Sequence, residues 1–402
     1  MKPDTSAKAN TMHDDTVQRT LDIMNRLIAF NTVSSEPNTP LIDWAANYLE
    51  GFGFDARVQR TADGRHANLF ASIGPGLTGG VVLSGHSDVV PVEGQPWTSD
   101  PFSMTRVGDR LVARGSADMK GFIACCLAQA ATFAKSGLKQ PLHIALSYNE
   151  ETNMQGMQDL TELLGSAGIK PAACVIGEPT SMQVVVANKG AAIFNVKVRG
   201  FSAHSSLRDT GVSAVEVGAE IISYLNGIQK KLRDAERHDG FEFPHTSIHA
   251  GWIHGGTAHN ITAPDCEFVF EIRALPGVDA NDILNDVRNY CDTVLVPQMR
   301  AIEPNCGITI EPVVNAPGLD ETGNRSLAQA IMPLCNCHTP GRVSFGTEAG
   351  FMTRVGIPTV VCGPGDIAVA HQPDEYVEVD QIAQCVRFLE TLDARLRQSA
   401  LL

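Results

Sequence analysis

Histidine and carboxylate residues follow apolar runs of the sequence at points where a chemical site could form. His86 and Asp88 come directly after the apolar run 81–83, and Asp118 lies further on among small residues. On an extended backbone, side chains two positions apart point to the same side, so Asp88 could orient His86 while the ring binds a metal. Each fragment alone has an ordinary interpretation, because His-x-Asp is usually a hydrogen-bonded turn and a single Asp before a helix is usually an N-cap.

Further ligand-type residues follow other strand-like runs. They are Glu150 and Glu151, Glu178, and His371. Neighbouring side chains diverge on an extended or turning backbone, so Glu151 could bind a metal while Glu150 handles a proton. A solvated acidic turn is the ordinary alternative for this pair. The combination of several strand ends that offer histidines and carboxylates to one rim is much harder to explain in that way.

The chemistry of this set points to a pair of metal ions. Nitrogen and oxygen ligands without sulfur suit zinc, cobalt or manganese. Two histidines and three acids exceed the four ligands of one tetrahedral zinc, whereas two ions that share a bridging carboxylate would use them all. Such a pair lowers the pKa of a bound water from 15.7 towards about 7, and a free glutamate can carry the proton to a leaving nitrogen. The residues therefore predict a two-metal hydrolase.

Short strands that alternate with helices must position these residues. This alternation predicts an α/β fold in which helices sandwich a mostly parallel sheet, and ligands bind at the carboxyl ends of such strands. The expected strands are 68–73, 81–84, 142–147, 173–176 and 359–362. The expected helices are 16–30, 41–51, 122–136 and 381–397.

The rhythm changes between residues 189 and 314. The expected order there is strand, helix, strand, strand, helix, strand, which is typical of a ferredoxin-like α+β unit. Its elements are 191–199, 212–232, 246–253, 266–274, 280–296 and 308–313. We therefore expect a catalytic domain formed by 1–188 and 315–402, with 189–314 inserted as a separate domain.

Composition narrows the classes of partner. A net charge of −14 argues against nucleic acid, and no basic amphipathic helix or long apolar run suggests a membrane. The first twenty residues lack the apolar core of a signal peptide, and the ten cysteines look like buried hydrophobes rather than a disulfide framework. We expect a cytoplasmic protein that acts on a small molecule.

Over nearly its whole length the sequence resembles the dinuclear-zinc deacylases and exopeptidases. This family includes acetylornithine deacetylase, succinyl-diaminopimelate desuccinylase, aminoacylase and glutamate carboxypeptidase. The resemblance implies two divalent ions, zinc or else cobalt, and a small domain that serves as a lid and forms a homodimer. It also implies roles that match the motifs residue by residue: His86, Glu151, Glu178 and His371 as metal ligands, Asp118 as the bridging ligand, Asp88 as the acid that orients His86, and Glu150 as the general base. In the family the bridging aspartate is often followed by a cis peptide bond.

The resemblance extends to the inserted domain. The stretch 200–206 is similar to the lid motif whose histidine, here His204, reaches the active site of the partner subunit and steadies the developing oxyanion. Asn260 and Arg273 are similar to residues that contact the carboxylate of the substrate, for which a guanidinium fork is well suited. A turn between strand and helix is the ordinary alternative for His204, and a surface salt bridge is the ordinary alternative for Arg273.

Within the family the motifs are most similar to those of the acetylornithine deacetylases. These motifs are 176–180, 254–256, 347–349, 362–365 and 370–376. The resemblance implies hydrolysis of N-acetylornithine to ornithine and acetate, a step of arginine biosynthesis, and we expect Glu348 to favour a cationic substrate side chain. The alternatives are another N-acyl amino acid deacylase, a succinyl-diaminopimelate desuccinylase, or a dipeptidase or carboxypeptidase of the same fold. A non-catalytic metal-binding protein would be expected to lack Glu150.

Overall fold

The computed structural model describes residues 5–235, 237–398 and 401, and within these the chain divides into two compact units. The first unit contains the chain up to Ala187 together with 320–341 and the part from Thr347 onward, and the second contains 188–319 and 342–346. Residues 1–4, which begin the polar N-terminal stretch, lie outside the described residues. No described helix is both long and apolar enough to cross a membrane.

The first unit is built on an eight-stranded sheet with the order β1-β2-β6-β3-β7-β14-β8-β13. Its strands are β1 (Asp55–Arg60), β2 (Ala67–Ile73), β3 (Val81–His86), β6 (Leu142–Ser147), β7 (Ala173–Pro179), β8 (Val185–Asn188), β13 (Gly341–Val343) and β14 (Thr359–Gly363). The four adjacent strands β6, β3, β7 and β14 are parallel, whereas β1, β2 and β8 join the sheet antiparallel. The carboxyl ends of the four parallel strands therefore meet at one edge.

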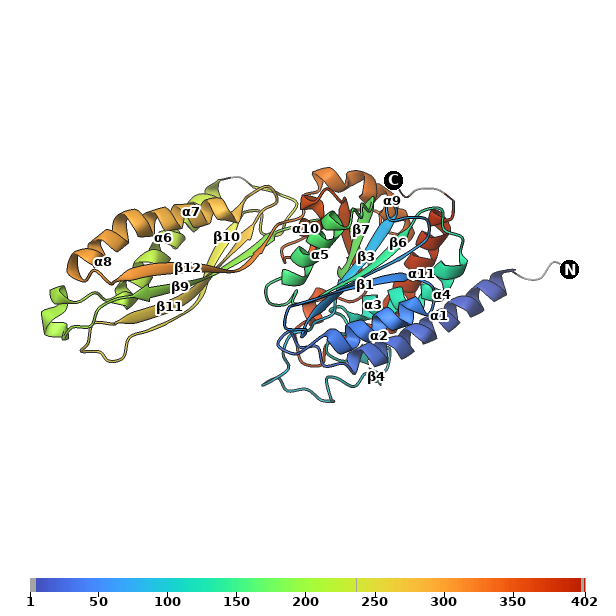
Figure 1. Ribbon diagram of the computed structural model, residues 1–402, viewed down its shortest axis with the longest axis horizontal. Coiled ribbons are helices and arrows are strands. Elements are labelled where there is room, and N and C mark those ends of the chain that lie inside the picture. Colours follow the sequence, from blue (N-terminus) through green and yellow to red (C-terminus); the bar gives the residue numbers. More distant parts are fainter. Residues whose placement is uncertain (1–4, 236, 399–400, 402) are drawn as a thin grey trace. The chain divides into compact units, whose positions relative to one another are not determined.

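The central strands are buried along their whole length, as expected where helices cover both faces of a parallel sheet. Alternate residues serve the two faces, so that Val81 and Leu83 join the main apolar core and Val82 faces away from it. Helices α1, α2, α3 and α11 contribute to that core, and α5 and α10 lie on the other face (Figure 1). The helices are α1 (Thr5–Ile28), α2 (Thr39–Glu50), α3 (Lys120–Ala128), α4 (Ala130–Lys135), α5 (Gln155–Ser166), α9 (Arg325–Ile331), α10 (Ala349–Arg354) and α11 (Val379–Leu396).

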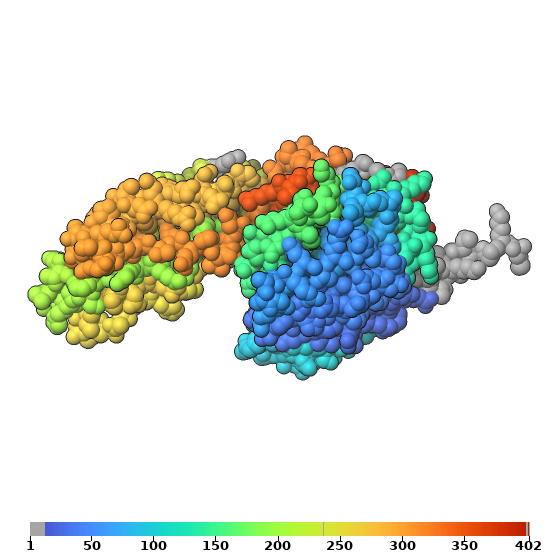
Figure 2. All heavy atoms as spheres, in the orientation of Figure 1, coloured from blue at the N-terminus to red at the C-terminus, as the bar shows by residue number. Residues whose placement is uncertain are grey.

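Two details of the first unit differ from the expected elements. The helix expected over 122–136 is divided at Gln129 into α3 and α4. Every residue of α3 is buried, so this helix lies inside the unit, whereas α1 and α2 form part of its outer surface, seen as blue spheres in Figure 2. A small three-stranded sheet, not expected from the sequence, is formed by β4 (Thr105–Val107), β5 (Arg110–Val112) and β15 (Tyr376–Glu378) in the order β15-β5-β4.

The second unit is a ferredoxin-like α+β fold. Its four strands form an antiparallel sheet with the order β10-β11-β9-β12, and its helices pack against that sheet. The elements are β9 (Gly190–Arg199), α6 (Ala214–Asp234), β10 (Ser247–Gly255), β11 (Asp265–Ala274), α7 (Ala280–Tyr290), α8 (Val296–Ile302) and β12 (Gly307–Ala316). The helical segment that was expected over 280–296 continues to Ile302. A π-helical turn over Cys291–Leu295 leads into α8, where Pro297 fits because the first turn of a helix needs no N–H donor.

The fold class expected from the sequence is confirmed by this arrangement. The sheet of the first unit is mixed rather than uniformly parallel, because its flanking strands run against their neighbours. The assignment of the two units to catalytic and lid roles stays a prediction.

Candidate metal centre

The candidate ligands gather at the carboxyl edge of the parallel strands. His86 is the last residue of β3 and is fully buried, and Glu178 lies near the end of β7 and is 4 % exposed. Gly177 precedes Glu178, and a Cβ atom there would lie 2.0 Å from the ring of Phe122. Only glycine allows β7 to approach α3 this closely, so the residue before the ligand fixes where the carboxylate emerges.

Two groups of potential ligand atoms share one residue, Asp118. The first group is His86, Asp118 and Glu178, and the second is Asp118, Glu151 and His371. Within each group the ligand atoms lie within 4.8 Å of one another. The structure therefore brings together all five residues for which the sequence suggested metal binding.

Asp118 lies between the two histidines. Its Oδ1 atom is 2.9 Å from Nε2 of His86, and its Oδ2 atom is 3.3 Å from Nε2 of His371. Each oxygen thus faces a different imidazole, which is the arrangement required of a carboxylate that bridges two ions. The peptide bond between Asp118 and Met119 is cis.

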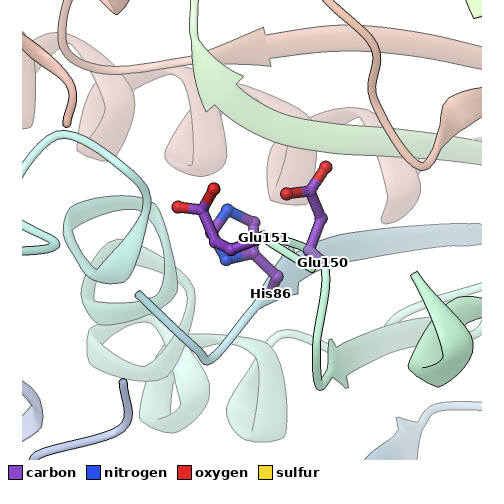
Figure 3. A group of neighbouring side chains, drawn as sticks. All are labelled: His86, Glu150 and Glu151. Carbon is purple, nitrogen blue, oxygen red and sulfur yellow. The ribbon is translucent and has the colours of Figure 1, made fainter. Parts of the chain in front are cut away.

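Glu150 and Glu151 follow β6 in one turn, and their side chains extend to the region around His86 (Figure 3). Oε1 of Glu151 lies 3.1 Å from Nε2 of His371. Glu150 belongs to a third group, formed by His86, Glu150 and Glu151. It does not belong to either of the two groups that share Asp118.

Asp88 orients the site through both its main chain and its side chain. Nδ1 of His86 is 3.0 Å from the backbone oxygen of Asp88 and 3.6 Å from its Oδ1. The carboxylate instead accepts the backbone N–H groups of Glu150 at 3.1 Å and Glu151 at 3.3 Å, and the hydroxyl of Ser34 at 2.6 Å. The backbone carbonyl of Asp88 therefore holds Nδ1 of His86. The carboxylate of Asp88 positions the turn that carries Glu150 and Glu151.

Burial dominates the electrostatics of the centre. It raises the pKa of the Glu178 and Glu150 carboxyls well above their ordinary values. Burial also acts to raise the pKa of Asp118, but hydrogen bonds to His371 and His86 outweigh it and lower that pKa. Hydrogen bonds to Asp118 and Glu151 raise the pKa of His371 to about 10. Burial acts to lower the pKa of His86, but Asp118 and the neighbouring carboxylates outweigh it and raise that pKa well above its ordinary value.

One carboxylate oxygen of the centre is left without a hydrogen-bond donor among the described residues. Within the described part of the chain, no group donates a hydrogen bond to Oε1 of Glu178, and Nε2 of His86 lies 4.0 Å from it. A buried carboxylate without a partner is costly, and oxygen and imidazole donors suit divalent ions. The residues fit a pair of cations, one held by each of the two groups that share Asp118.

Four candidates from the sequence remain. His204, Asn260 and Arg273 belong to the second unit, where the backbone N–H of Ser205 donates to the oxygen of Asn260 at 3.0 Å and so keeps His204 and Asn260 close. Arg273 pairs with Glu271 at 3.1 Å.

Glu348 belongs to the first unit, and its side chain is fully buried. Burial raises its pKa to about 7. Its charge interacts with those of His86, Asp88 and Glu150, so it lies near the candidate centre. Its contact with a substrate stays a prediction.

Several residues that support the centre were given no role from the sequence. Glu375 accepts the backbone N–H of Asp118 at 3.1 Å and is paired with Arg114 at 2.6 Å, with both side chains almost completely buried. Ser34, which bonds Asp88, follows the first helix in a segment that gave no pattern. The available hints were the positions of these residues, since Glu375 lies within the motif 370–376 and Arg114 directly precedes Gly115.

Comparison with known proteins identifies a family. The family described as "Peptidase family M20/M25/M40" matches residues 82–393, a span that contains every candidate ligand. An acetylornithine deacetylase from Erwinia tasmaniensis is 35 % identical over 380 residues, covering 91 % of this chain and 96 % of the relative. An acetylornithine deacetylase from Buchnera aphidicola is 32 % identical over 364 residues, covering 89 % and 93 %.

The fold is also shared with solved structures. The YXEP protein of Bacillus subtilis, described as a dinuclear metal binding peptidase from the M20 family, has a TM-score of 0.65. It is 13 % identical, and the match covers 96 % of this chain and 99 % of that one. At this identity the likeness establishes the common fold.

Proposed function

The chain belongs to peptidase family M20/M25/M40, and on that basis we propose that it is a deacetylase that hydrolyses N-acetylornithine to ornithine and acetate. The observation that carries the proposal is the position of Asp118, whose two oxygens face His86 and His371. The two relatives named acetylornithine deacetylase support the choice of substrate, because each aligns with most of the chain.

Two divalent ions, zinc or else cobalt, complete the proposed site. His86, Asp118 and Glu178 would hold one, and Asp118, Glu151 and His371 the other. The nitrogen and oxygen donors support either metal, and the dinuclear YXEP protein of the same family supports a pair. When bound, such a pair lowers the pKa of a water molecule to about 7.

Glu150 is the proposed general base. Its carboxyl accepts a proton from the attacking water, whose oxygen bonds to the acetyl carbon, and then delivers the proton to the nitrogen as the C–N bond breaks. Burial raises the pKa of Glu150 well above its ordinary value, which favours acceptance of that proton. The hydrogen bond from the backbone N–H of Glu150 to Asp88 supports this role, because it fixes the base.

His204 is proposed to donate a hydrogen bond to the tetrahedral oxygen from a second copy of the chain. Its Nδ1 accepts the backbone N–H of Ser206 at 3.2 Å, so a neutral ring carries its proton on Nε2. The ring is exposed and Nε2 is therefore accessible. A donor of this kind contributes about 2.7–4 kcal/mol to transition-state stabilisation. Asn260 and Arg273 are proposed to bind the carboxylate of the substrate.

A homodimer formed through the second unit is part of the same proposal. Strand β10 is an edge strand of the four-stranded sheet, and such an edge presents unpaired backbone groups. Trp252 and Ile253 on this strand are 41 % and 42 % exposed. An exposed edge with large apolar side chains supports association with a second copy, which the mass of the protein in solution would test. A cytoplasmic location is also proposed, supported by ten cysteines that are all free thiols.

A panel of substrates tests the proposed function. The full chain, loaded with Zn²⁺ or Co²⁺, is assayed on N-acetylornithine, N-acetylalanine, N-succinyl-diaminopimelate and a dipeptide. We expect the highest kcat/KM on N-acetylornithine. The variant Glu150→Gln, prepared in parallel, measures any contaminating hydrolase. A preference for the dipeptide would assign the chain to the peptidases of the family, and turnover no higher than that of Glu150→Gln on every compound would overturn the proposal.

A further inference from the structure

Gln95 connects two segments of the first unit that are far apart in the sequence. Its Nε2 donates a hydrogen bond to the backbone oxygen of His371 at 2.9 Å. Its Oε1 accepts from Nη2 of Arg114 at 2.7 Å and from the indole N–H of Trp97 at 3.0 Å. Both polar atoms of the amide are engaged, so this side chain has one orientation in which all three bonds are made.

Arg114 anchors Gln95 in the interior of the unit. The guanidinium is 1 % exposed, pairs with Glu375 at 2.6 Å, and lies 5.1 Å from the centre of the Trp97 ring. Oε1 of Glu375 in turn accepts the backbone N–H groups of Ala117 at 2.9 Å and Asp118 at 3.1 Å. A continuous series of hydrogen bonds therefore runs between the backbones of two candidate metal ligands, through Asp118, Glu375, Arg114, Gln95 and His371.

Additional bonds hold the same two segments together. The backbone N–H and the hydroxyl of Thr98 both donate to Oδ1 of Asp374, at 2.9 and 3.0 Å. Nη1 of Arg114 lies 3.4 Å from the backbone oxygen of Gln372. The loop that carries His371 is thus tied to 95–98 on its outer side and to Arg114 on its inner side.

His371 differs from the other four candidate ligands in its need for such support. Its side chain is 47 % exposed, whereas those of His86, Asp118, Glu151 and Glu178 are at most 7 % exposed. Its backbone has φ = 63°, in the left-handed region that residues with a side chain rarely adopt. Packing alone does not fix this residue, so its position depends on the hydrogen bonds to its backbone.

We propose that Gln95 is a positioning residue that holds His371 ready for the second metal ion. The proposal rests on the proposed function, because it presupposes a pair of cations. Gln95 bonds the backbone of His371 and of no other candidate ligand. Loss of the bond to His371 alone therefore weakens the site formed by Asp118, Glu151 and His371 and leaves the site formed by His86, Asp118 and Glu178 unchanged. Partners that orient a metal ligand typically change metal affinity by about 10–100-fold.

The substitution Gln95→Glu isolates this role. The new side chain keeps the shape and the acceptor for Arg114 and Trp97, and it loses only the donor to the oxygen of His371. It also adds a negative charge near the site, which by itself would strengthen cation binding, so a weakened site cannot be attributed to charge. The metal-free full chain is titrated with Co²⁺ by calorimetry. We expect one binding step unchanged within about twofold and the other weakened by about tenfold.

Two further measurements separate positioning from general damage. The control Gln384→Glu makes the same chemical change at a half-buried position of α11, where Nε2 bonds Asp380 at 2.6 Å, and both steps should stay as in the unaltered protein. With N-acetylornithine as substrate, the Co²⁺ concentration for half-maximal activity of Gln95→Glu should rise about tenfold, with kcat at saturating Co²⁺ within about threefold. The second variant Gln95→Leu removes the donor without adding charge, and it also removes the acceptor for Arg114 and Trp97. The same binding step should again be the one that weakens more.

The possible results separate failure of this inference from failure of the proposed function. If the unaltered protein binds two Co²⁺ ions and Gln95→Glu and Gln95→Leu bind both as tightly, the inference is overturned and the proposed function stands. If both steps weaken equally in these variants, Gln95 supports the unit as a whole and the inference is again overturned. If the unaltered protein binds fewer than two ions, both the inference and the dinuclear site are overturned.

Discussion

The carboxylate of Asp88 accepts the backbone N–H of Glu150 at 3.1 Å, so an acid that follows one strand fixes the glutamate turn that follows its neighbour. Strands β3 and β6 are parallel and adjacent, which brings these two segments together. A second bond, from the backbone N–H of Glu151 at 3.3 Å, uses the other oxygen. The spacing between a proposed base and a proposed metal ligand is therefore set by Asp88.

The substitution Asp88→Asn tests this relationship. An amide offers one oxygen and one NH₂, and the NH₂ cannot accept from a backbone N–H, so one of the two bonds is lost. We expect kcat/KM to fall by about 10–100-fold, as for other residues that orient metal ligands. Steady-state kinetics at a saturating metal concentration measures this fall in kcat/KM. Asp279→Asn is the control, because Asn caps the second-unit helix α7 as well as Asp does and should leave kcat/KM unchanged.

The substitution Glu150→Gln should separate proton transfer from metal binding. The amide has a similar shape but cannot take a proton, so kcat should fall by about 10²–10⁴-fold. Because Glu150 belongs to neither group that shares Asp118, two ions should still bind. Metal analysis of the dialysed variant checks this. Glu178→Gln provides the contrast, since there the loss of activity should be accompanied by loss of metal. Substantial activity in Glu150→Gln would mean that another group carries the proton.

Removal of metal should abolish activity and lower stability. Without cations, burial and the neighbouring carboxylates disfavour the charged forms of Glu150 and Glu178 more than the charge of His86 favours them. An ion present at 100 times its Kd contributes about 2.7 kcal/mol to the free energy of unfolding. We expect treatment with a chelator to lower Tm and eliminate turnover, and added Zn²⁺ or Co²⁺ to restore both. An unchanged Tm together with unchanged turnover would show that the carboxylate cluster needs no ion.

His143 should make the first unit less stable in acid. This histidine is fully buried on β6, bonds the hydroxyl of Ser72 at 2.8 Å and stacks on Phe70, and burial lowers its pKa from 6.5 to about 4. Between pH 6.5 and 4, His143 therefore binds a proton in the unfolded chain but stays neutral in the folded chain. The contribution of His143 to the free energy of unfolding is fully present above pH 6.5 and is lost as the pH falls towards 4. The loss is about 3 kcal/mol, because each pKa unit corresponds to about 1.36 kcal/mol.

A variant comparison isolates this contribution from that of the carboxylates. His143→Gln keeps a polar group near Ser72 but does not titrate in this range. Urea unfolding of both proteins is followed from pH 7 to pH 4. The difference in free energy of unfolding, unaltered protein minus variant, should decrease by about 3 kcal/mol over that interval. A difference that is independent of pH would contradict the assignment.

Four of the five candidate ligands could be placed from the sequence because each follows its own apolar run, whereas Asp118 lies among small residues. Parallel strands end at the same edge, so His86 and Glu178 had to approach one another once the strands were recognised. The order of elements in the second unit was predictable for a similar reason, since alternation and helical spacing are local properties.

Other features depend on contacts that leave no local pattern. Gln95 is an ordinary loop glutamine in the sequence, and its importance arises from three bonds to residues that the chain brings together only on folding. The antiparallel direction of β2 is set by the connection between strands, and its apolar residues would be the same in either direction. The carboxylate of Asp88 was expected to hold His86, but the backbone carbonyl of Asp88 lies closer to that ring.

Glu348 provides the most direct test of substrate choice. Its carboxyl is fully buried and has a pKa raised to about 7 by burial, so near neutral pH it exchanges between a neutral and an anionic form. If it selects a cationic side chain, Glu348→Gln should lower kcat/KM for N-acetylornithine about tenfold and leave that for N-acetylalanine nearly unchanged, because only the first loses an ionic partner. The ratio of the two constants, measured at pH 8 where the carboxylate predominates, is the readout. Equal losses on both substrates would instead make Glu348 a support for the metal centre.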